Sequence, residues 1–223
     1  MSQQPISVIL TGTTGMVGEG VLLECLASPN VSRVLSVVRR SSGYTHAKLK
    51  ELIVPSFLSL DDVEEQLAGY DACFFCSGIS SVGMKEAEYT RITYDTTLHF
   101  AETLARLNPQ MVFEYVSGAH TDPTEQGRSM WARVKGRTEN ALTRLPFRAA
   151  YNLRPGAMRP SPHQRFVPGM MKIIGTLYPV FRLVLPSSVS TLSQIGRAMI
   201  RIAQEGYGKQ VLEVPDLNSL AKP

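Results

Sequence analysis

The sequence predicts an α/β fold in which a doubly wound parallel sheet is flanked by helices on both faces. Short apolar runs alternate with helical patterns, which is typical of βαβ connections. The runs are almost continuously apolar, as expected for strands buried on both faces of a parallel sheet. A glycine-rich turn directly after the first run supports the same class. We expect strands at residues 6–10, 34–38, 51–54, 72–76, 111–116, 149–153 and 211–214.

Helical patterns lie between several of these strands and after them. We expect helices at residues 17–27, 63–67, 86–107, 129–145 and 192–204. The stretch 155–168 is rich in proline and polar residues and indicates a loop. We therefore expect one domain over residues 1–223, in which residues 157–223 form a small C-terminal portion that contacts substrate or acts as a lid.

The charge balance limits the classes of partner. The chain of 223 residues has 23 lysines and arginines against 19 acidic residues, and a net charge of +4. This mild excess suits an anionic ligand such as a phosphorylated cofactor. No basic run exceeds the doublet Arg39-Arg40, so we expect a small-molecule substrate and no nucleic acid. A homodimer or a protein partner stays open.

The three cysteines indicate a reducing compartment, and we expect the cytoplasm. Cys73 and Cys76 match the C-x-x-C pattern of redox and metal sites. Side chains three positions apart on a strand point to opposite faces, so we interpret both as core residues. We expect no metal ion. The first apolar run is too short for a signal peptide.

The most apolar segment is residues 169–185. Lys172, Pro179 and Arg182 interrupt it, and it is shorter than the roughly 20 residues that span a bilayer. We therefore expect no integral membrane segment. A lid, a subunit contact and a membrane-surface element are all open interpretations of this segment.

The turn after the first strand has the spacing of a phosphate-binding loop. Gly12, Gly15 and Gly18 stand three positions apart, directly before a predicted helix. Gly12 permits a tight turn, Gly15 lets the backbone approach a pyrophosphate, and Gly18 lets helix and strand pack closely. The helix N-terminus offers N–H groups to the phosphates. Further cofactor contacts are expected from Thr13, Thr14, Met16 and Val17.

The end of the second strand indicates the type of dinucleotide. In sites for NAD an acid usually stands about 20 residues past the glycines and binds the ribose 2′-hydroxyl. This sequence has Arg39 at that point, followed by Arg40. A guanidinium can bind a 2′-phosphate through two parallel hydrogen bonds. We therefore predict NADP rather than NAD.

Five features occur in a characteristic order: the TGxxGxxG loop at residues 11–18, Ser77-Gly78 and Ser117 at two strand ends, Lys135 on a helix, and the Arg-Pro-Gly turn at residues 154–156. Over residues 7–156 the chain resembles the short-chain dehydrogenase/reductase superfamily. It is most similar to the atypical, compact epimerase-like group. The resemblance implies a Rossmann-type fold that binds a nicotinamide dinucleotide.

The resemblance also implies catalytic roles. Ser117 matches the serine that polarises the substrate oxygen. Lys135 matches the lysine that holds the nicotinamide ribose and lowers the pKa of a tyrosine four positions earlier. Trp131 stands in that tyrosine position. An indole N–H donates one hydrogen bond but cannot exchange a proton near neutral pH, so the usual general acid is missing. Without a cofactor, Lys135 would be an exposed helix lysine paired with Glu139.

Other residues are candidates for the site. By resemblance, Ser77 and Gly78 line the edge of the cofactor, and Pro155 and Gly156 lie near the nicotinamide. A histidine side chain suits general acid–base chemistry, so His120 could supply the missing proton, although a surface-loop histidine is the commoner case. Two further candidates for the proton are Tyr115, on the same strand face as Ser117, and His163, in the loop before the apolar segment 169–185.

Two functions fit these features. The first is an NADP-dependent oxidoreductase or epimerase-like enzyme that acts on a small carbonyl or hydroxyl compound. The second is a catalytically impaired NADP-binding module that senses redox state or regulates a protein partner. Ser117 and Lys135 favour the first function, and Trp131 favours the second. A nucleotide-sugar substrate is disfavoured because only about 65 residues follow Gly156.

Overall fold

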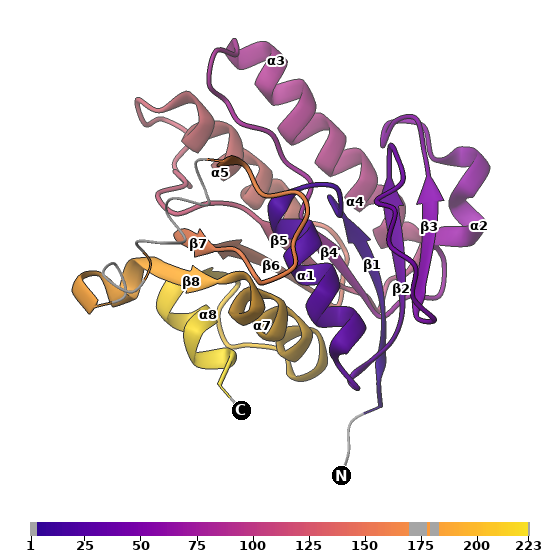
Figure 1. The fold of residues 1–223 in the computed structure, drawn as a ribbon. Helices are drawn as coiled ribbons and strands as arrows, with labels where there is room; N and C mark the ends of the chain where they lie inside the picture. Colours follow the sequence, from indigo (N-terminus) through magenta and orange to yellow (C-terminus); the bar gives the residue numbers. More distant parts are fainter. Residues whose placement is uncertain (1–3, 170–177, 179–182, 223) are drawn as a thin grey trace.

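The computed structural model describes residues 4–169, 178 and 183–222, and these contain a parallel sheet of seven strands (Figure 1). The order across the sheet is β3-β2-β1-β4-β5-β6-β9. The order reverses between β1 and β4, and such a switch point opens a crevice at the carboxyl ends of the strands. The strands are β1 (Ile6–Thr11), β2 (Val31–Val38), β3 (Leu49–Ile53), β4 (Ala72–Phe75), β5 (Val112–Val116), β6 (Ala149–Arg154) and β9 (Val211–Glu213).

Helices cover both faces of this sheet, so the predicted doubly wound α/β class is confirmed. On one face lie α1 (Met16–Ala27), α7 (Leu192–Glu205) and α8 (Val214–Leu220). On the other lie α2 (Glu64–Leu67), α4 (Thr96–Leu107) and α5 (Met130–Leu142). A 3-10 turn, η1 (Asp61–Val63), leads into α2. All seven predicted strands are present, and where a predicted end differs from the observed one, it does so by one to three residues.

Side chains of the strands alternate between two cores. On β1, Val8 and Leu10 join the core under α1 and α7, whereas Ile9 joins the core under α4 and α5. Cys73 is buried in the second core and Cys76 packs against the first. Both thiols are free. The interpretation of these cysteines as core residues is therefore confirmed.

The helix expected at residues 86–107 contains an irregular turn. It comprises α3 (Glu86–Thr90), a π-helical turn η2 (Arg91–Asp95) and α4. Thr93 lies in the π-helical turn, and its buried hydroxyl has no hydrogen-bond partner among the described residues. Such turns insert one extra residue and often occur at functional sites.

The C-terminal portion begins with a short strand that the sequence pattern did not predict. Residues 155–168 were expected to form a loop, but they include a strand, β7 (Ala157–Arg159), which pairs with β8 (Val189–Thr191) in a separate two-stranded sheet. A 3-10 turn, η3 (Pro186–Ser188), precedes β8. Beyond it, α7, β9 and α8 complete the main sheet and one core. Elements of this portion therefore contribute to the main sheet and to one of its cores.

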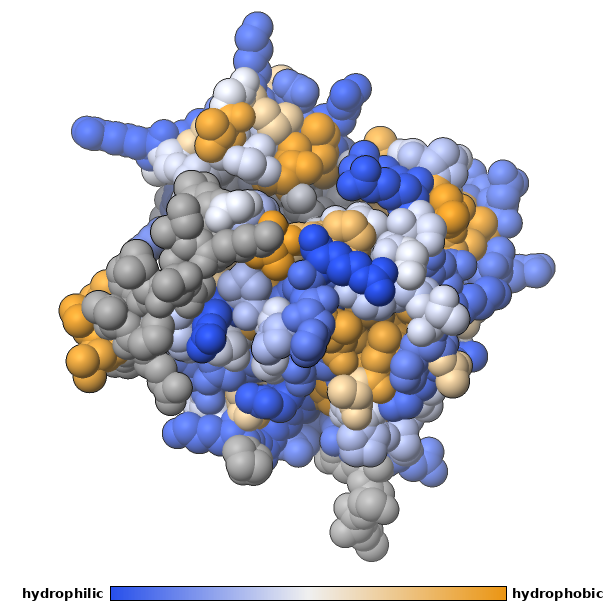
Figure 2. Space-filling model, viewed as in Figure 1, coloured by the Kyte–Doolittle hydropathy of each residue, from blue (hydrophilic) through white to orange (hydrophobic). Residues whose placement is uncertain are grey.

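The apolar segment 169–185 lies mostly outside the described residues, and so do Lys172, Pro179 and Arg182. Its end is described: Leu183, Val184 and Leu185 are exposed, at the left edge of the face in Figure 2. Among the described residues, no helix has the length and apolar character needed to cross a bilayer.

One carboxyl group is buried within the sheet. Glu114 on β5 is fully buried, and neither of its carboxyl oxygens has a hydrogen-bond partner among the described residues. Burial raises the pKa of Glu114 well above its usual range. The folded protein therefore keeps this carboxyl protonated, whereas the unfolded chain releases the proton near pH 4.

Replacement of Glu114 by glutamine should change how stability depends on pH. Because the folded wild type keeps this proton while the unfolded chain releases it, the free energy of unfolding of the wild type falls as pH rises above about 4. The free energy of unfolding of Glu114→Gln relative to wild type should therefore increase by about 1 kcal/mol or more between pH 4 and pH 8. Urea denaturation at both pH values measures it, with Glu102→Gln, an exposed glutamate, as control. A difference that does not vary with pH contradicts this account.

Candidate functional site

The carboxyl ends of four adjacent strands bring most of the predicted site residues to one edge of the sheet. The glycine turn follows β1, Ser77 follows β4, Ser117 follows β5 and Pro155 follows β6. The backbone N–H of Ser117 donates to the carbonyl of Leu153 at 2.8 Å, which extends the β5–β6 pairing to the site. The sheet topology therefore joins residues that are far apart in sequence.

The glycine turn is closely attached to the end of β4. Gly12 has a φ of 75°, and a Cβ at this position would stand 2.7 Å from the carbonyl oxygen of Cys76. The side-chain oxygen of Thr11 accepts hydrogen bonds from the N–H groups of Cys76 and Ser77, at 3.1 Å each. Glycine is required here by both the backbone conformation and the neighbouring strand.

Gly18 and Gly15 have different surroundings. A Cβ on Gly18 would overlap the backbone carbonyl of Gly12, so glycine lets α1 approach the turn. Gly15 is exposed and is the N-cap of α1 without a side-chain cap. A Cβ there would only approach the oxygen of Gly12 at 3.4 Å. The N–H groups of the first turn of α1 have no carbonyl partner within the helix and can receive an anion.

The two threonines of the turn differ. The hydroxyl of Thr13 is buried and lies 2.7 Å from the hydroxyl of Ser36 on β2. This hydroxyl therefore holds the turn to the sheet, and the backbone of Thr13 is the part that can contact a ligand. Thr14, Met16 and Val17 are partly exposed at the start of α1.

Arg39 and Arg40 are exposed just beyond the end of β2. Among the described residues, neither side chain makes an ion pair or a hydrogen bond. The next two residues are held by the carboxylate of Glu51 on β3, which accepts hydrogen bonds from Ser41 and Ser42. Burial raises the pKa of Glu51, but these hydrogen bonds outweigh it and keep the pKa below its usual value. The loop is thus fixed while the two guanidinium groups stay available.

Ser117, Lys135 and Trp131 lie together at the end of β5. The ammonium group of Lys135 donates to the carbonyl of Ser117 at 3.1 Å and stands 5.4 Å from the centre of the Tyr115 ring. The indole ring of Trp131 passes 3.6 Å from where a Cβ of Gly118 would be. The hydroxyl of Ser117 lies 3.0 Å from that of Thr121, which donates to the carbonyl of Gly118. A serine hydroxyl, an amine and an indole therefore share one small region.

The expectation that Lys135 would pair with Glu139 if it had only a structural role is wrong. Glu139 is buried and forms a two-pronged ion pair with Arg154, at 3.0 and 2.6 Å. Lys135 turns instead to the strand end. Burial lowers the pKa of Lys135 to about 8, although Glu139 partly opposes this shift. Lys135 can therefore lose its proton close to neutral pH.

The remaining predicted residues lie in different surroundings. Gly78 is exposed, and a Cβ there would meet nothing within 4 Å. Gly156 follows the buried Pro155, and a Cβ on it would overlap the carbonyl of Ser188, so close packing requires glycine there. His120 and His163 are both exposed and have positive φ values of 66° and 70°.

Tyr115 cannot replace the missing acid. It is buried, and burial raises the pKa of its phenol far above the usual range. Its ring instead forms a wall against which the ammonium group of Lys135 packs. Of the sequence-predicted proton donors, the two exposed histidines remain.

Two contributions were missed by sequence reasoning. Thr121 bonds the hydroxyl of Ser117 and so sets its direction. Glu19 is fully buried in the first turn of α1, where it accepts hydrogen bonds from the C-terminal portion. The sequence did contain a signal for the role of Glu19. A glutamate stands among apolar residues of the predicted helix, one residue after the last glycine of the turn.

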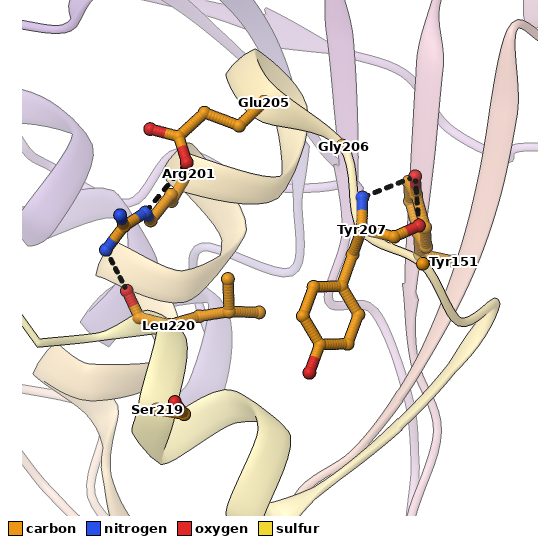
Figure 3. A pocket seen from close by; sticks show the side chains of 8 residues that line it. Tyr151, Arg201, Glu205, Gly206, Tyr207, Ser219 and Leu220 are labelled. Carbon is orange, nitrogen blue, oxygen red and sulfur yellow. Dashed lines mark hydrogen bonds and ion pairs between the residues drawn. The ribbon is translucent and has the colours of Figure 1, made fainter.

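A separate cavity of about 690 Å³ lies at the opposite edge of the sheet (Figure 3). Its lining comes from Tyr151 on β6, the end of α7, the loop before β9 and the end of α8. Its polar groups bond one another: Arg201 pairs with Glu205, and the N–H of Tyr207 donates to the hydroxyl of Tyr151 at 2.9 Å.

In the described part of the chain, no group of three or more metal-ligating side chains could hold an ion.

No protein-family model matches the chain. The chain is 27% identical over 199 residues to peramine synthetase ppzA of Metarhizium rileyi, a match that covers 76% of this chain and 7% of that protein. It is also 27% identical over 157 residues to the mitochondrial protein fmp52 of Emericella nidulans, with 67% and 66% covered. The chain thus corresponds to a small part of the synthetase and to about two thirds of fmp52.

Solved structures share the fold. ADP-L-glycero-D-manno-heptose-6-epimerase of Helicobacter pylori has a TM-score of 0.68 at 13% identity, with 98% of this chain and 81% of that chain covered. A short chain dehydrogenase of Salmonella enterica serovar Typhi gives 0.61 at 12%, covering 95% and 96%. NADPH-bound carbonyl reductase from chicken fatty liver gives 0.62 at 12%, covering 92% and 89%. The resemblance to short-chain dehydrogenases/reductases is therefore confirmed at the level of the fold.

Gly18, within α1, and Gly15, its N-cap, should respond differently to replacement by alanine. Gly18→Ala places a methyl group against the backbone of Gly12 and should lower the free energy of unfolding by about 1–3 kcal/mol. Gly15→Ala has room and an extended backbone, with φ −125° and ψ 162°, so the change should stay within about 0.5 kcal/mol. Thermal or urea denaturation measures both variants. Equal losses would contradict the tight approach of α1 to the turn at Gly18.

The titration of Lys135 should be visible directly. After reductive methylation with ¹³C, one lysine signal in the NMR spectrum should titrate near pH 8, because burial lowers the pKa of Lys135 to about 8. That signal should be absent from Lys135→Arg. Lys50→Arg, at an exposed lysine, is the control and should leave that signal in place. If every lysine signal titrates near pH 10.4, the burial of this amine is incorrect.

Proposed function

We propose that this chain binds NADP(H) at the carboxyl edge of β1, β4 and β5 and acts as an oxidoreductase or epimerase-like enzyme on a small carbonyl or hydroxyl compound. The observation that carries the proposal is the joint position of Ser117, Lys135 and Trp131 at the same edge of the sheet as the glycine turn. The chain would act as a single domain, with residues 157–223 on the substrate side of the site.

The residues at this edge fit a dinucleotide. The open side of Gly15 and the start of α1 would receive the pyrophosphate. Arg39 and Arg40 would face the 2′-phosphate, which favours NADP over NAD. The fold-sharing structures include one described with NAD+ and one with NADPH, so the fold accommodates either. The backbone of Thr13 and the turn Ser77-Gly78 would line the same groove.

The side chains suggest how a carbonyl group would be handled. Ser117 would donate a hydrogen bond to the substrate oxygen once its hydroxyl turns from Thr121. Lys135 would hold the ribose hydroxyls and keep positive charge near the developing oxyanion. Trp131 would pack against the flat ring of a ligand and exclude water. The cofactor, when bound, supplies or accepts the hydride.

His120 is the proposed proton donor. It is exposed on the loop that leaves Ser117, and its positive φ of 66° is an uncommon conformation for a residue with a side chain. Such conformations concentrate at functional sites. In the reducing direction, the imidazolium would release its proton to the substrate oxygen as that oxygen gains negative charge.

A second function is supported by one observation, the indole in the usual acid position. If no group replaces the missing tyrosine, the chain would be a catalytically impaired NADP-binding module that senses redox state or regulates a protein partner. Trp131→Tyr separates the two functions. Turnover that is absent in wild type and appears in Trp131→Tyr favours the binding module.

Hydride transfer tests the proposed enzyme. Oxidation of NADPH with a panel of small aldehydes and ketones should proceed in wild type and fall by about 100-fold in Ser117→Ala and in His120→Ala, because each loses a group that stabilises the new oxygen. Ser32→Ala, an exposed serine near the amino end of β2, should retain full activity. Unchanged turnover in Ser117→Ala and His120→Ala removes both residues from the mechanism.

A further inference from the structure

A short piece of the C-terminal portion binds directly to the start of α1. We call residues 164–166 the strap. The side-chain amide of Gln164 donates to the carbonyl of Met16 at 2.7 Å, and Met16 is the first residue of α1. Figure 1 shows this segment, in orange, crossing the start of α1. The strap therefore touches the helix end that faces the predicted pyrophosphate.

Glu19 anchors the strap. Its buried carboxylate accepts hydrogen bonds from the backbone N–H groups of Arg165 and Phe166, at 2.6 and 2.8 Å. It also accepts one from the hydroxyl of Tyr44, at 2.7 Å, on the loop between β2 and β3. Burial, followed by the hydrogen bond to Glu19, raises the pKa of Tyr44 to about 12, so the phenol stays a donor. One carboxylate thus joins α1, the strap and the β2–β3 loop.

This arrangement places the side chain of Arg165 on the β2–β3 loop. Its guanidinium carbon lies 4.2 Å from the centre of the Tyr44 ring, and one of its nitrogens donates to the carbonyl of Gly43 at 3.3 Å. Arg165 is exposed, and these partners carry no charge. The oxygens of Glu19 are occupied by Tyr44 and by strap N–H groups, and no ion pair links Glu19 to Arg165 among the described residues. The positive charge of Arg165 therefore remains available to a ligand.

The same loop begins at Arg39 and Arg40. Gly43 is only four residues beyond Arg39, and the serines between them are fixed by Glu51. A guanidinium that stacks on an aromatic ring still has N–H groups free in its own plane, directed away from the ring. One fixed loop therefore begins with two exposed arginines and is contacted by a third, Arg165, from a distant segment.

We propose that Arg165 is a specificity-determining residue for the cofactor: through the strap, the C-terminal portion supplies a third guanidinium to the 2′-phosphate of NADP. This inference rests on the proposed function. A phosphate monoester has three terminal oxygens, more than one arginine can satisfy through paired hydrogen bonds. The strap bonds to the start of α1 and reaches the β2–β3 loop through Arg165. Glu19 therefore links the C-terminal portion, on the proposed substrate side, to the start of α1, on the proposed cofactor side.

Calorimetric titration with NADPH and with NADH tests the assignment. Arg165→Met keeps an apolar stem over Tyr44 but removes the charge and the donors. We expect the Kd for NADPH to rise about tenfold and the Kd for NADH to change less than about twofold, since only NADPH carries the 2′-phosphate. Arg165→Lys should give an intermediate Kd for NADPH, because a lysine retains the charge without the paired geometry.

Arg197→Met is the matched control, because Arg197 is exposed on α7 and has no described ion pair. It should leave both Kd values unchanged. An equal rise for both cofactors in Arg165→Met would assign the strap a general structural role and overturn the inference, as would no change for either. If wild type binds neither cofactor, the proposed function fails together with the inference. If wild type prefers NADPH and Arg165→Met keeps that preference, only the inference fails.

Discussion

The close approach of α1 to the turn after β1 is the constraint on which the rest of the site depends. It exists because Gly12 and Gly18 lack side chains that would collide with Cys76 and with the turn itself. The approach directs the N-terminus of α1 at the crevice beside the switch point of the sheet, where phosphates are stabilised. It also carries Glu19 into the position from which it holds the strap. A side chain at Gly18 would therefore disturb both the phosphate-binding turn and the attachment of the C-terminal portion.

The parts of the fold that could be predicted are those encoded by local pattern. Continuous apolar runs located all seven strands of the sheet, and the glycine spacing located the turn, because burial on two faces and a tight approach leave clear marks in sequence. The pair β7 and β8 was missed, since three-residue strands form through distant pairing that no local pattern reports. The strap was missed for the same reason: Gln164 and Glu19 are 145 residues apart in sequence.

The residues of the site were likewise predictable only where local spacing determines their position. Spacing along α5 predicted that Lys135 and Trp131 would share a face, and the structure brings Lys135 to Ser117 and Trp131 to the neighbouring Gly118. Spacing could not predict that Arg154 would take Glu139 and leave Lys135 to the strand end. Nor could it predict that the hydroxyl of Thr13 would be occupied by Ser36. In each case a buried partner from another strand decides where a polar side chain points, because an unpaired polar group is costly in the interior.

The most direct test of the central claim, that NADP(H) binds beside Ser117 and Lys135, uses the indole of Trp131. It is the only tryptophan of the chain, and reduced nicotinamide accepts excitation energy from a nearby indole. Titration of the purified protein with NADPH should therefore quench the tryptophan emission to saturation and produce sensitised emission from the nicotinamide. An NADPH titration that leaves the emission of Trp131 unchanged up to millimolar cofactor would contradict the account.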